Sequence, residues 1–472
     1  MPEIVLPGTY IEVRAEGLIS AGRVVTGNIG IVGTAAKGPV DEVKILGSLS
    51  EAREIFGESD EWIDGSKDEL TLIRALELIY KNGGQTVYAV RTANLKNDPK
   101  KLSTASYTLK SDSKDLLKLE TSIPGTWGNK IKIEISDAGI AEAKTKKVEL
   151  FYERIQESYE VQNADDLAEQ VNKKSALVKA TGLSDTNKTK LPENVDKKNF
   201  EGGANGANAT TDNYQRSLAL LENEIVNIVL LAGQDISKTG MADALQGHLK
   251  ATAGIKRERI GIIGSGFTDG KEDLAQIVTK IPNNEDGRLI YTAPGILVTA
   301  NGKQSRLPGG YLAAAVAGLI ASLSVQASPT NKILTIEGLT TEFNSSQLEK
   351  LVTSRVLAVE KRNGFRVVKG ITTADSPWNQ ITTRRIVDYA IYGVRSSCDP
   401  YIGKLNNDRV RGAMKATLDA FLTRMVDDEA LVSYKLNVSA TRAQEIAGEA
   451  IVTMTLMPTF SIDFIKVTMY LS

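Results

Sequence analysis

The chain has 472 residues, 42% of them apolar and 24% charged, so about three domains with well-buried cores are expected. Its 57 basic and 58 acidic side chains give a net charge of −1, which argues against binding to nucleic acid or to an anionic membrane and permits self-association. The single cysteine, Cys398, excludes an internal disulfide, and the single histidine, His248, removes most zinc and acid–base schemes. No signal peptide or membrane-spanning pattern is present, so we expect a protein made and folded in a cytoplasm.

The first residues of the chain alternate apolar and polar side chains with the period of a β-strand, and this pattern ends at Gly17. We interpret them as an extended arm that can be added to a sheet of the same chain or of a neighbouring one. A strand that only completes the sheet of its own domain is the alternative. The residues assigned to the arm strand are Tyr10, Ile11, Glu12 and Val13.

Residues 18–92 alternate short apolar runs with helical periodicity. Strand, helix and strand in this order predict a parallel sheet, and hence an α/β domain. The predicted strands are residues 28–33, 43–46 and 86–91, and the predicted helices are residues 51–56 and 70–80.

The composition changes between Lys96 and Lys198, where 18 lysines accompany a single arginine, Arg154. The strands predicted here, near residues 131–136 and 148–152, alternate strictly, which is typical of antiparallel sheets with one solvated face. We therefore predict a separate, mostly antiparallel module inserted into the first domain. The polar residues 184–211 are interpreted as its return linker.

The α/β pattern resumes near Tyr214. Residues 311–324 are almost wholly small and apolar, so this helix is expected to be buried on nearly all sides. A last module begins near Trp378 and contains two predicted helices followed by antiparallel strands, which is an α+β arrangement. The predicted helices are residues 382–397 and a second one that begins at Asn406 or Asn407; the predicted strands are residues 432–438 and 449–457.

The last residues of the chain, 460–472, again alternate with the period of a strand. A terminal strand has unpaired backbone groups along its edge, so it needs a partner strand. The apolar positions assigned to inter-subunit strand exchange are Ile465, Val467, Met469 and Leu471.

Two patterns invite a catalytic or cofactor-binding interpretation. The run Gly264-Ser265-Gly266 between a strand and a helix is similar to a dinucleotide-binding turn, but Gly270 falls one residue too late for G-x-G-x-x-G. Ser265 as a nucleophile would need His248 as its base, and no motif places a carboxylate to orient that histidine. Neither a phosphate-binding loop nor a Cys/His cluster is present, so we predict no enzyme activity, no cofactor and no metal.

Several sequence blocks, in the same order along nearly the whole chain, resemble the contractile tail sheath proteins of phages and related injection machines. The blocks are residues 7–12 (PGTYIE), 31–33 (IVG) with 37–39 (KGP), 82–84 (NGG), 124–129 (PGTWGN), 307–311 (LPGGY) with 327–332 (ASPTNK), 363–366 (NGFR) and 383–386 (TRRI).

The resemblance implies a subtilisin-like parallel-sheet α/β core without catalytic residues. It also implies hexameric rings stacked helically around an inner tail tube, within a virion tail that contracts. The expected partners are other copies of the chain, the tube protein, and baseplate and tail terminator proteins, with Arg409, Arg411 and Lys415 as possible tube contacts. The expected organisation is an N-terminal arm (1–17), a discontinuous core (18–92 and 214–370), an inserted β-sandwich-like module with its return linker (96–211), a C-terminal α+β module (371–457) and a C-terminal arm strand (458–472).

Two other interpretations remain open at this point. A sheath of a bacterial contractile injection particle would have the same sequence features as a phage sheath. Another self-assembling structural protein would also use terminal strands, but it would not require the ordered blocks.

Overall fold

The structure is a computed structural model that describes residues 25–60, 69–96, 101–138, 145–182, 185–267, 272–300 and 302–470. Two compact units are present. We call residues 26–324 and 328–381 the sheet unit, and residues 325–327 and 382–470 the hairpin unit. The predicted N-terminal arm, with Tyr10, Ile11, Glu12 and Val13, lies outside the described residues.

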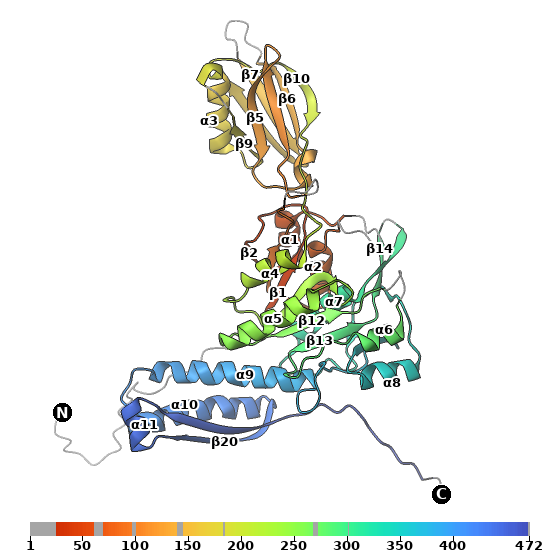
Figure 1. Ribbon diagram of the computed structural model, residues 1–472, viewed down its shortest axis with the longest axis vertical. Helices are drawn as coiled ribbons and strands as arrows, with labels where there is room; N and C mark the ends of the chain where they lie inside the picture. The colour runs from red at the N-terminus through yellow and green to blue at the C-terminus, as the bar shows by residue number, and fades with distance from the viewer. Residues whose placement is uncertain are drawn as a thin grey trace, which may run out of the picture. The chain divides into compact units, whose positions relative to one another are not determined.

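The sheet unit is built on a nine-stranded sheet with the order β16-β19-β18-β13-β12-β11-β1-β3-β2 (Figure 1). Six neighbouring strands, from β18 to β3, are parallel, as the alternation of strands and helices predicts. The strands at the two ends of the sheet pair antiparallel. Their bounds are β1 Ile29–Gly33, β2 Val43–Leu46, β3 Val87–Arg91, β11 Ile228–Asp235, β12 Ile260–Gly264, β13 Leu289–Ala293, β16 Ile333–Leu334, β18 Leu357–Lys361 and β19 Phe365–Val367.

Helices cover both faces of this sheet, so its central strands are buried along their whole length. One core lies under α1, α2 and α7, and the other lies under α4, α5, α6 and α8. Ser48 caps α1 by accepting from the backbone N–H of Glu51. The helices are α1 Leu49–Phe56, α2 Leu72–Lys81, α4 Thr211–Ala219, α5 Met241–Gly254, α6 Leu274–Thr279, α7 Gly309–Ser322 and α8 Ser345–Thr353.

Helix α7 is the small apolar helix that the sequence predicts to be buried. Residues 309–320 of this helix are all buried, because it packs between α2 and the sheet. A Cβ atom at Gly318 would lie 2.3 Å from the backbone oxygen of Ile79 in α2. The glycine therefore allows two helix backbones to approach more closely than larger side chains permit. Three strands form a small separate sheet: β14 Ile296–Ala300 and β15 Lys303–Leu307 come before α7 in the chain, and β17 Gly338–Leu339 comes after it.

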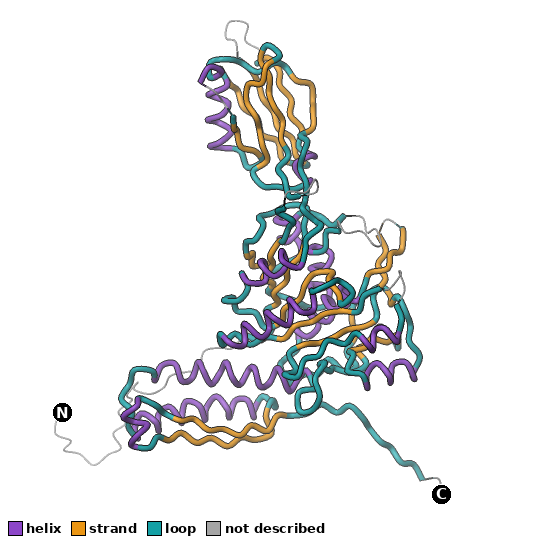
Figure 2. The backbone as a smooth tube through the Cα atoms, in the orientation of Figure 1, coloured by secondary structure: helices purple, strands orange, loops and turns teal. Residues whose placement is uncertain are grey.

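Residues 103–204 form two further antiparallel sheets around a core of their own (Figure 2). One sheet has the order β4-β5-β9 and the other β10-β6-β7-β8, with α3 packed on the first. Part of the predicted return linker, β10, is an edge strand of the second sheet; its sequence, VDKKN, has no apolar alternation by which to recognise it. The elements are β4 Ser106–Ser111, β5 Lys114–Thr121, η1 Thr126–Lys130, β6 Lys132–Asp137, β7 Lys146–Tyr152, β8 Ile155–Val161, α3 Ala164–Lys174, β9 Val178–Thr181, η2 Asp185–Asn187 and β10 Val195–Asn199.

The fully buried Arg91, at the end of β3, joins this inserted module to the large sheet. Its guanidinium group donates to the carbonyl oxygens of Gly38 at 2.6 Å, Pro124 at 2.9 Å and Asn205 at 3.4 Å. Pro124 lies in the loop between β5 and η1 of the module, and Asn205 lies in the segment that leads out of it. One cation therefore holds a loop and the exit segment of the module on the end of a parallel strand, and burial lowers the pKa of Arg91 to about 10.

The hairpin unit contains two long helices and a two-stranded antiparallel sheet. Helix α10 begins at the Asn407 cap that the sequence predicts, and its apolar face packs on the inner face of the hairpin. Gly393 of α9 admits the ring of Phe421 of α10, since a Cβ there would lie 1.8 Å from that ring. The elements are α9 Ile381–Cys398, η3 Asp399–Tyr401, α10 Asp408–Asp427, β20 Leu431–Ser439, α11 Arg442–Ala447 and β21 Ile451–Pro458.

Replacing Arg91 should loosen the joint between the inserted module and the sheet. We expect Arg91→Met to lower the free energy of unfolding of the sheet unit by about 2–4 kcal/mol, because it leaves one buried and two partly buried carbonyl groups without their charged donor. Urea unfolding followed by tryptophan fluorescence measures this, since Trp127 lies next to the joint. The exposed Arg154 is the matched control, and Arg154→Met should change the value by less than about 0.5 kcal/mol. Equal effects of the two substitutions would contradict the assignment.

Candidate functional site

The glycine turn after β12 is a packing contact. A Cβ atom at Gly264 would lie 1.8 Å from the backbone carbonyl carbon of Gly309, and one at Gly266 would lie 2.3 Å from Oδ1 of Asp235. The space that a pyrophosphate would occupy in a dinucleotide-binding turn is therefore filled by the first turn of α7. These glycines are explained by the close approach of a helix to the sheet.

Ser265 does not meet the histidine that a nucleophile would need. Its hydroxyl donates to Oε1 of Glu272 at 3.4 Å, and its backbone N–H donates to Thr292. The side chain is fully buried behind Gly309, whose N–H donates to the Ser265 carbonyl oxygen at 2.7 Å. Ser265 therefore contributes to joining β12, β13 and α7.

His248 is buried on α5 and contacts the guanidinium group of Arg259 at 3.2 Å through Nε2. Arginine only donates, so Nε2 is the acceptor and the imidazole is neutral. Burial, and then the charge of Arg259, lower the pKa of His248 to about 3. The other donors of Arg259 bind the carbonyl oxygens of Leu221, Glu222 and Glu224. This histidine thus orients an arginine that holds the turn before β11.

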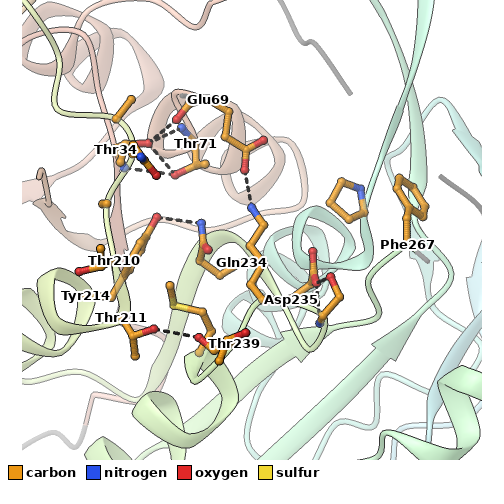
Figure 3. A pocket seen from close by; sticks show the side chains of 17 residues that line it. Thr34, Glu69, Thr71, Thr210, Thr211, Tyr214, Gln234, Asp235, Thr239 and Phe267 are labelled. Atoms are coloured by element: carbon orange, nitrogen blue, oxygen red, sulfur yellow. Dashed lines mark hydrogen bonds and ion pairs between the residues drawn. The ribbon is translucent and has the colours of Figure 1, made fainter. Parts of the chain in front are cut away.

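A cavity of about 490 Å³ opens where the parallel strands β1 and β11 end (Figure 3). This position, where successive connections leave the sheet in opposite directions, is the usual ligand crevice of open parallel sheets. Thr34 follows β1, and Gln234 and Asp235 end β11. Glu69 and Thr71, from the segment before α2, complete one wall.

The charged groups of this cavity are paired with one another. Nζ of Lys238 donates to Glu69 at 2.7 Å, and burial raises the pKa of Glu69 while Lys238 opposes the rise. Asp235 accepts from the N–H of Ser237, and burial likewise raises the pKa of Asp235. The amide of Gln234 donates to the Tyr214 hydroxyl at 2.8 Å. The Lys238–Glu69 ion pair thus joins two segments that are 169 residues apart in the sequence. No sequence motif connects these two residues, so the sequence analysis did not predict the pair.

The hairpin unit presents a sheet with unpaired edges. Among the described residues, β20 and β21 pair only with each other, so the outer edge of each strand has backbone donors and acceptors with no partner strand. Their side chains alternate, with one face on α10 and the other exposed. A sheet of this kind can accept an added strand.

The segment after β21 is extended and carries apolar side chains that are exposed to solvent. Residues 459–470 form no strand within the chain, and their large apolar side chains are exposed. The structure thus places Ile465, Val467 and Met469 on an extended exposed segment, whereas Leu471 lies outside the described residues. Exposed apolar side chains in such density mark a binding segment.

The three basic residues predicted on α10 differ in their surroundings. Arg409 and Lys415 are exposed. Arg411 is buried and forms ion pairs with Asp408 and with Glu445, the latter at 2.9 Å. No sequence pattern distinguishes Arg411 from the other two, because its acidic partner Glu445 lies in a different helix, α11.

The fold is that of the sheath proteins of contractile tails and injection systems. Solved sheath tail proteins from Desulfitobacterium hafniense and Listeria innocua match with TM-scores of 0.65 and 0.63 at 14% and 16% identity; they cover 96% and 93% of this chain, which covers 100% and 96% of theirs. The helical sheath of the anti-feeding prophage in its contracted state matches with a TM-score of 0.57 at 14% identity, over 99% of both chains. No helix in the described ranges is long and apolar enough to cross a membrane.

The sequence comparisons agree. The model of the phage tail sheath protein central domain matches residues 207–373, and that of the phage tail sheath C-terminal domain matches residues 373–472. Together they cover more than half of the chain, which belongs to the phage tail sheath protein family. A tail sheath protein of Staphylococcus phage Twort is 28% identical over 204 residues, and a relative of the same description from Enterococcus phage phiEF24C is 25% identical over 296 residues. These matches cover 42% and 59% of this chain but only 33% and 49% of the relatives, so the chain spans at most about half of their length.

The state of His248 makes stability depend on pH in a defined direction. The pKa of His248 is about 3 in the fold against 6.5 unfolded, so the unfolded chain binds more protons between these values and stability rises with pH there. We expect the stability of the wild type minus that of His248→Gln to rise by about 1.4 kcal/mol per pH unit up to pH 6.5 and to be constant above it. Urea unfolding at several values between pH 4.5 and 8 measures this. A constant difference throughout would show that His248 is not held neutral.

Proposed function

We propose that the chain is the structural subunit of a contractile tail sheath. It assembles as hexameric rings stacked helically around an inner tail tube, and its contraction drives the tube through the envelope of a target cell. The observation that carries the proposal is the pairing of an open two-stranded sheet with an exposed, alternating apolar segment directly after it. The hairpin of one copy needs a further strand at its edge, and the exposed segment of another copy can supply that strand.

In this assembly the terminal strands of neighbouring copies join the β20–β21 hairpin. Each backbone hydrogen bond contributes about 0.5–1.5 kcal/mol net, and each copy adds several. Ile465, Val467, Met469 and Leu471 set the register, because a shift by one residue would turn all four to the other face of the sheet. Head-to-tail contacts that do not close extend into a helical array. Tyr10, Ile11, Glu12 and Val13 are assigned the same role at the other end of the chain.

The architecture follows the same proposal. The parallel sheet and its helices form a subtilisin-like core, over residues 18–92 and 214–370, that moves as a rigid body and has no catalytic role. The inserted module, residues 96–211, faces away from the tube, and residues 371–457 form the module that bears the arms. The buried contacts of His248 and Ser265 support a structural use of the residues that a hydrolase would need.

The partners beyond the sheath itself are the inner tube, the baseplate and the tail terminator. For the tube we assign Arg409 and Lys415, which are exposed on α10. Arg411 serves the contact indirectly, since its ion pairs hold α10 against α11. A virion tail is the location that fits these partners.

A bacterial contractile injection particle is the second candidate, because its sheath uses the same fold. Structural neighbours include sheaths of the anti-feeding prophage and of an extracellular contractile injection system, both in the contracted state. Identification of the genes adjacent to this one separates the two, since a phage tail is accompanied by capsid and packaging genes.

Electron microscopy of the purified protein tests the proposal directly. We expect the concentrated chain, alone or with the tube protein, to form hollow, cross-striated cylinders in negative stain, because strand exchange between copies would satisfy the open hairpin edges. Chains that remain monomeric under both conditions would contradict the proposal.

Removal of the last eight residues, 465–472, tests the role of the arm. We expect soluble, folded monomers, because the deletion removes the added strand and leaves the cores of both units intact. Analytical ultracentrifugation measures the assembly state, and circular dichroism checks the fold. The control is Lys466→Thr in the full chain, which keeps the apolar positions and should still assemble. Normal cylinders from the deletion variant would refute the arm assignment.

A further inference from the structure

The segment after β21 changes the phase of its alternation in the middle. Its apolar side chains occupy even positions up to Phe464 and odd positions from Ile465 onward. Successive side chains of an extended segment point to opposite sides, so the two sets face opposite directions. We call residues 459–464 the proximal half and residues 465–471 the distal half. If the distal half is a strand on one sheet face, the proximal half presents its apolar side chains the other way and needs a second apolar surface.

In the structure, the apolar side chains of the proximal half are exposed and its polar side chains are less exposed, in the alternation that the sequence shows. Phe460, Ile462 and Phe464 are 61%, 80% and 78% exposed, whereas the intervening Ser461 and Asp463 are half-buried, with the Ser461 hydroxyl 3.4 Å from Asp463. Large apolar side chains thus face outward along this half.

Three large exposed apolar side chains lie at one end of the hairpin unit. Ile402 and Leu405, in the loop before α10, and Ile446, on α11, are 79%, 77% and 77% exposed. The amide of Asn406 donates to the carbonyl oxygen of Glu449 at 2.8 Å, and Arg411 bonds both Asn406 and Glu445. These contacts hold the loop beside the α11 turn. We call Ile402, Leu405 and Ile446 the end patch.

The end patch and the proximal half lie at opposite ends of β21. The patch adjoins the start of this strand, next to Glu449, and the proximal half follows its last residue, Pro458 (Figures 1 and 2). The strand from Ile451 to Pro458 is about 24 Å long, while Ile462 and Phe464 can lie at most about 14 Å and about 22 Å from Pro458. The three apolar side chains of the proximal half therefore cannot together cover the end patch of their own chain, so we consider the end patch of a second copy.

We propose that the proximal half of one copy docks on the end patch of a second copy, with Phe460, Ile462 and Phe464 against Ile402, Leu405 and Ile446. This inference rests on the proposed function for the path of the distal half, and it assigns the proximal half a different docking surface. Because donor and acceptor surfaces lie at opposite ends of one unit, the contact is head-to-tail and repeats from copy to copy. The change of phase at residues 464–465 places the two halves on opposite sides of the arm.

Directed disulfide formation tests the contact. In a Cys398→Ser background, chains with Ile462→Cys are mixed with chains with Leu405→Cys or Ile446→Cys, assembled, and oxidised. We expect a cross-linked dimer with at least one of the two patch positions. In the matched control, Ser461→Cys replaces Ile462→Cys; its side chain points away, so the dimer should be reduced several-fold. Efficient cross-linking of Ile462→Cys to Met457→Cys, on the exposed face of the hairpin, would instead overturn the proposal.

The outcomes distinguish this inference from the proposed function. Cylinders that form without a cross-link to the patch refute the inference alone, whereas chains that never assemble refute both. A second measurement does not depend on cysteine geometry: Leu405→Asp should raise the protein concentration needed for assembly at least about tenfold, since it places a charge in an apolar contact. Gly254→Asp, at the exposed end of α5, is the control with the same added charge, since a Cβ atom there meets no other atom within 4 Å. Equal effects of the two substitutions would refute the contact.

Discussion

The close packing of α7 against the parallel sheet is the constraint on which the sheet unit depends. Its first turn contacts the backbone at the end of β12, where Gly264 has no room for a Cβ atom, and its last turns contact α2 through Gly318. Such contacts fill the end of β12 with backbone, at an edge of the sheet where α/β proteins commonly bind ligands. The cavity where β1 and β11 end stays open at the same edge, and its walls are joined by the Lys238–Glu69 pair.

The buried cations of the sheet unit also join segments that are far apart in the sequence. Arg91 holds a loop and the exit segment of the inserted module, Arg259 holds the turn before β11 with His248 as an acceptor, and Lys238 pairs with Glu69 across the cavity. Each buried cation satisfies oxygen atoms from segments far apart in sequence, because a buried charge without such partners would be costly. The inserted module is thus joined to the sheet by a defined polar contact, a property that favours rigid-body movement of the whole unit.

Much of this fold could be predicted from the sequence, and the exceptions have physical reasons. The small apolar side chains of residues 311–324 predict a buried helix, which the structure places at Gly309–Ser322. The cap predicted at Asn406 or Asn407 is Asn407, which begins α10. Strand β10 has no apolar periodicity, because as a polar edge strand it is defined by backbone pairing alone. That His248 is the single histidine of the chain, with no motif that places a carboxylate beside it, already argues against catalysis. Its burial and neutral state follow only from the tertiary contact with Arg259. The partner of Arg411 was equally hidden, since Glu445 belongs to another helix.

The candidate interaction site shows a different limit of sequence reasoning. The alternation after β21 predicts a strand, yet residues 459–470 form none within the single chain. The apolar side chains of a strand show which of its faces becomes buried. The surface that buries this face need not belong to the same chain. A segment that is exposed in one copy, next to a sheet that lacks neighbours, is therefore a consistent pair of observations. The change of phase within the segment extends this argument: its apolar side chains follow two opposite faces in turn, which is why we propose a second docking surface for the arm.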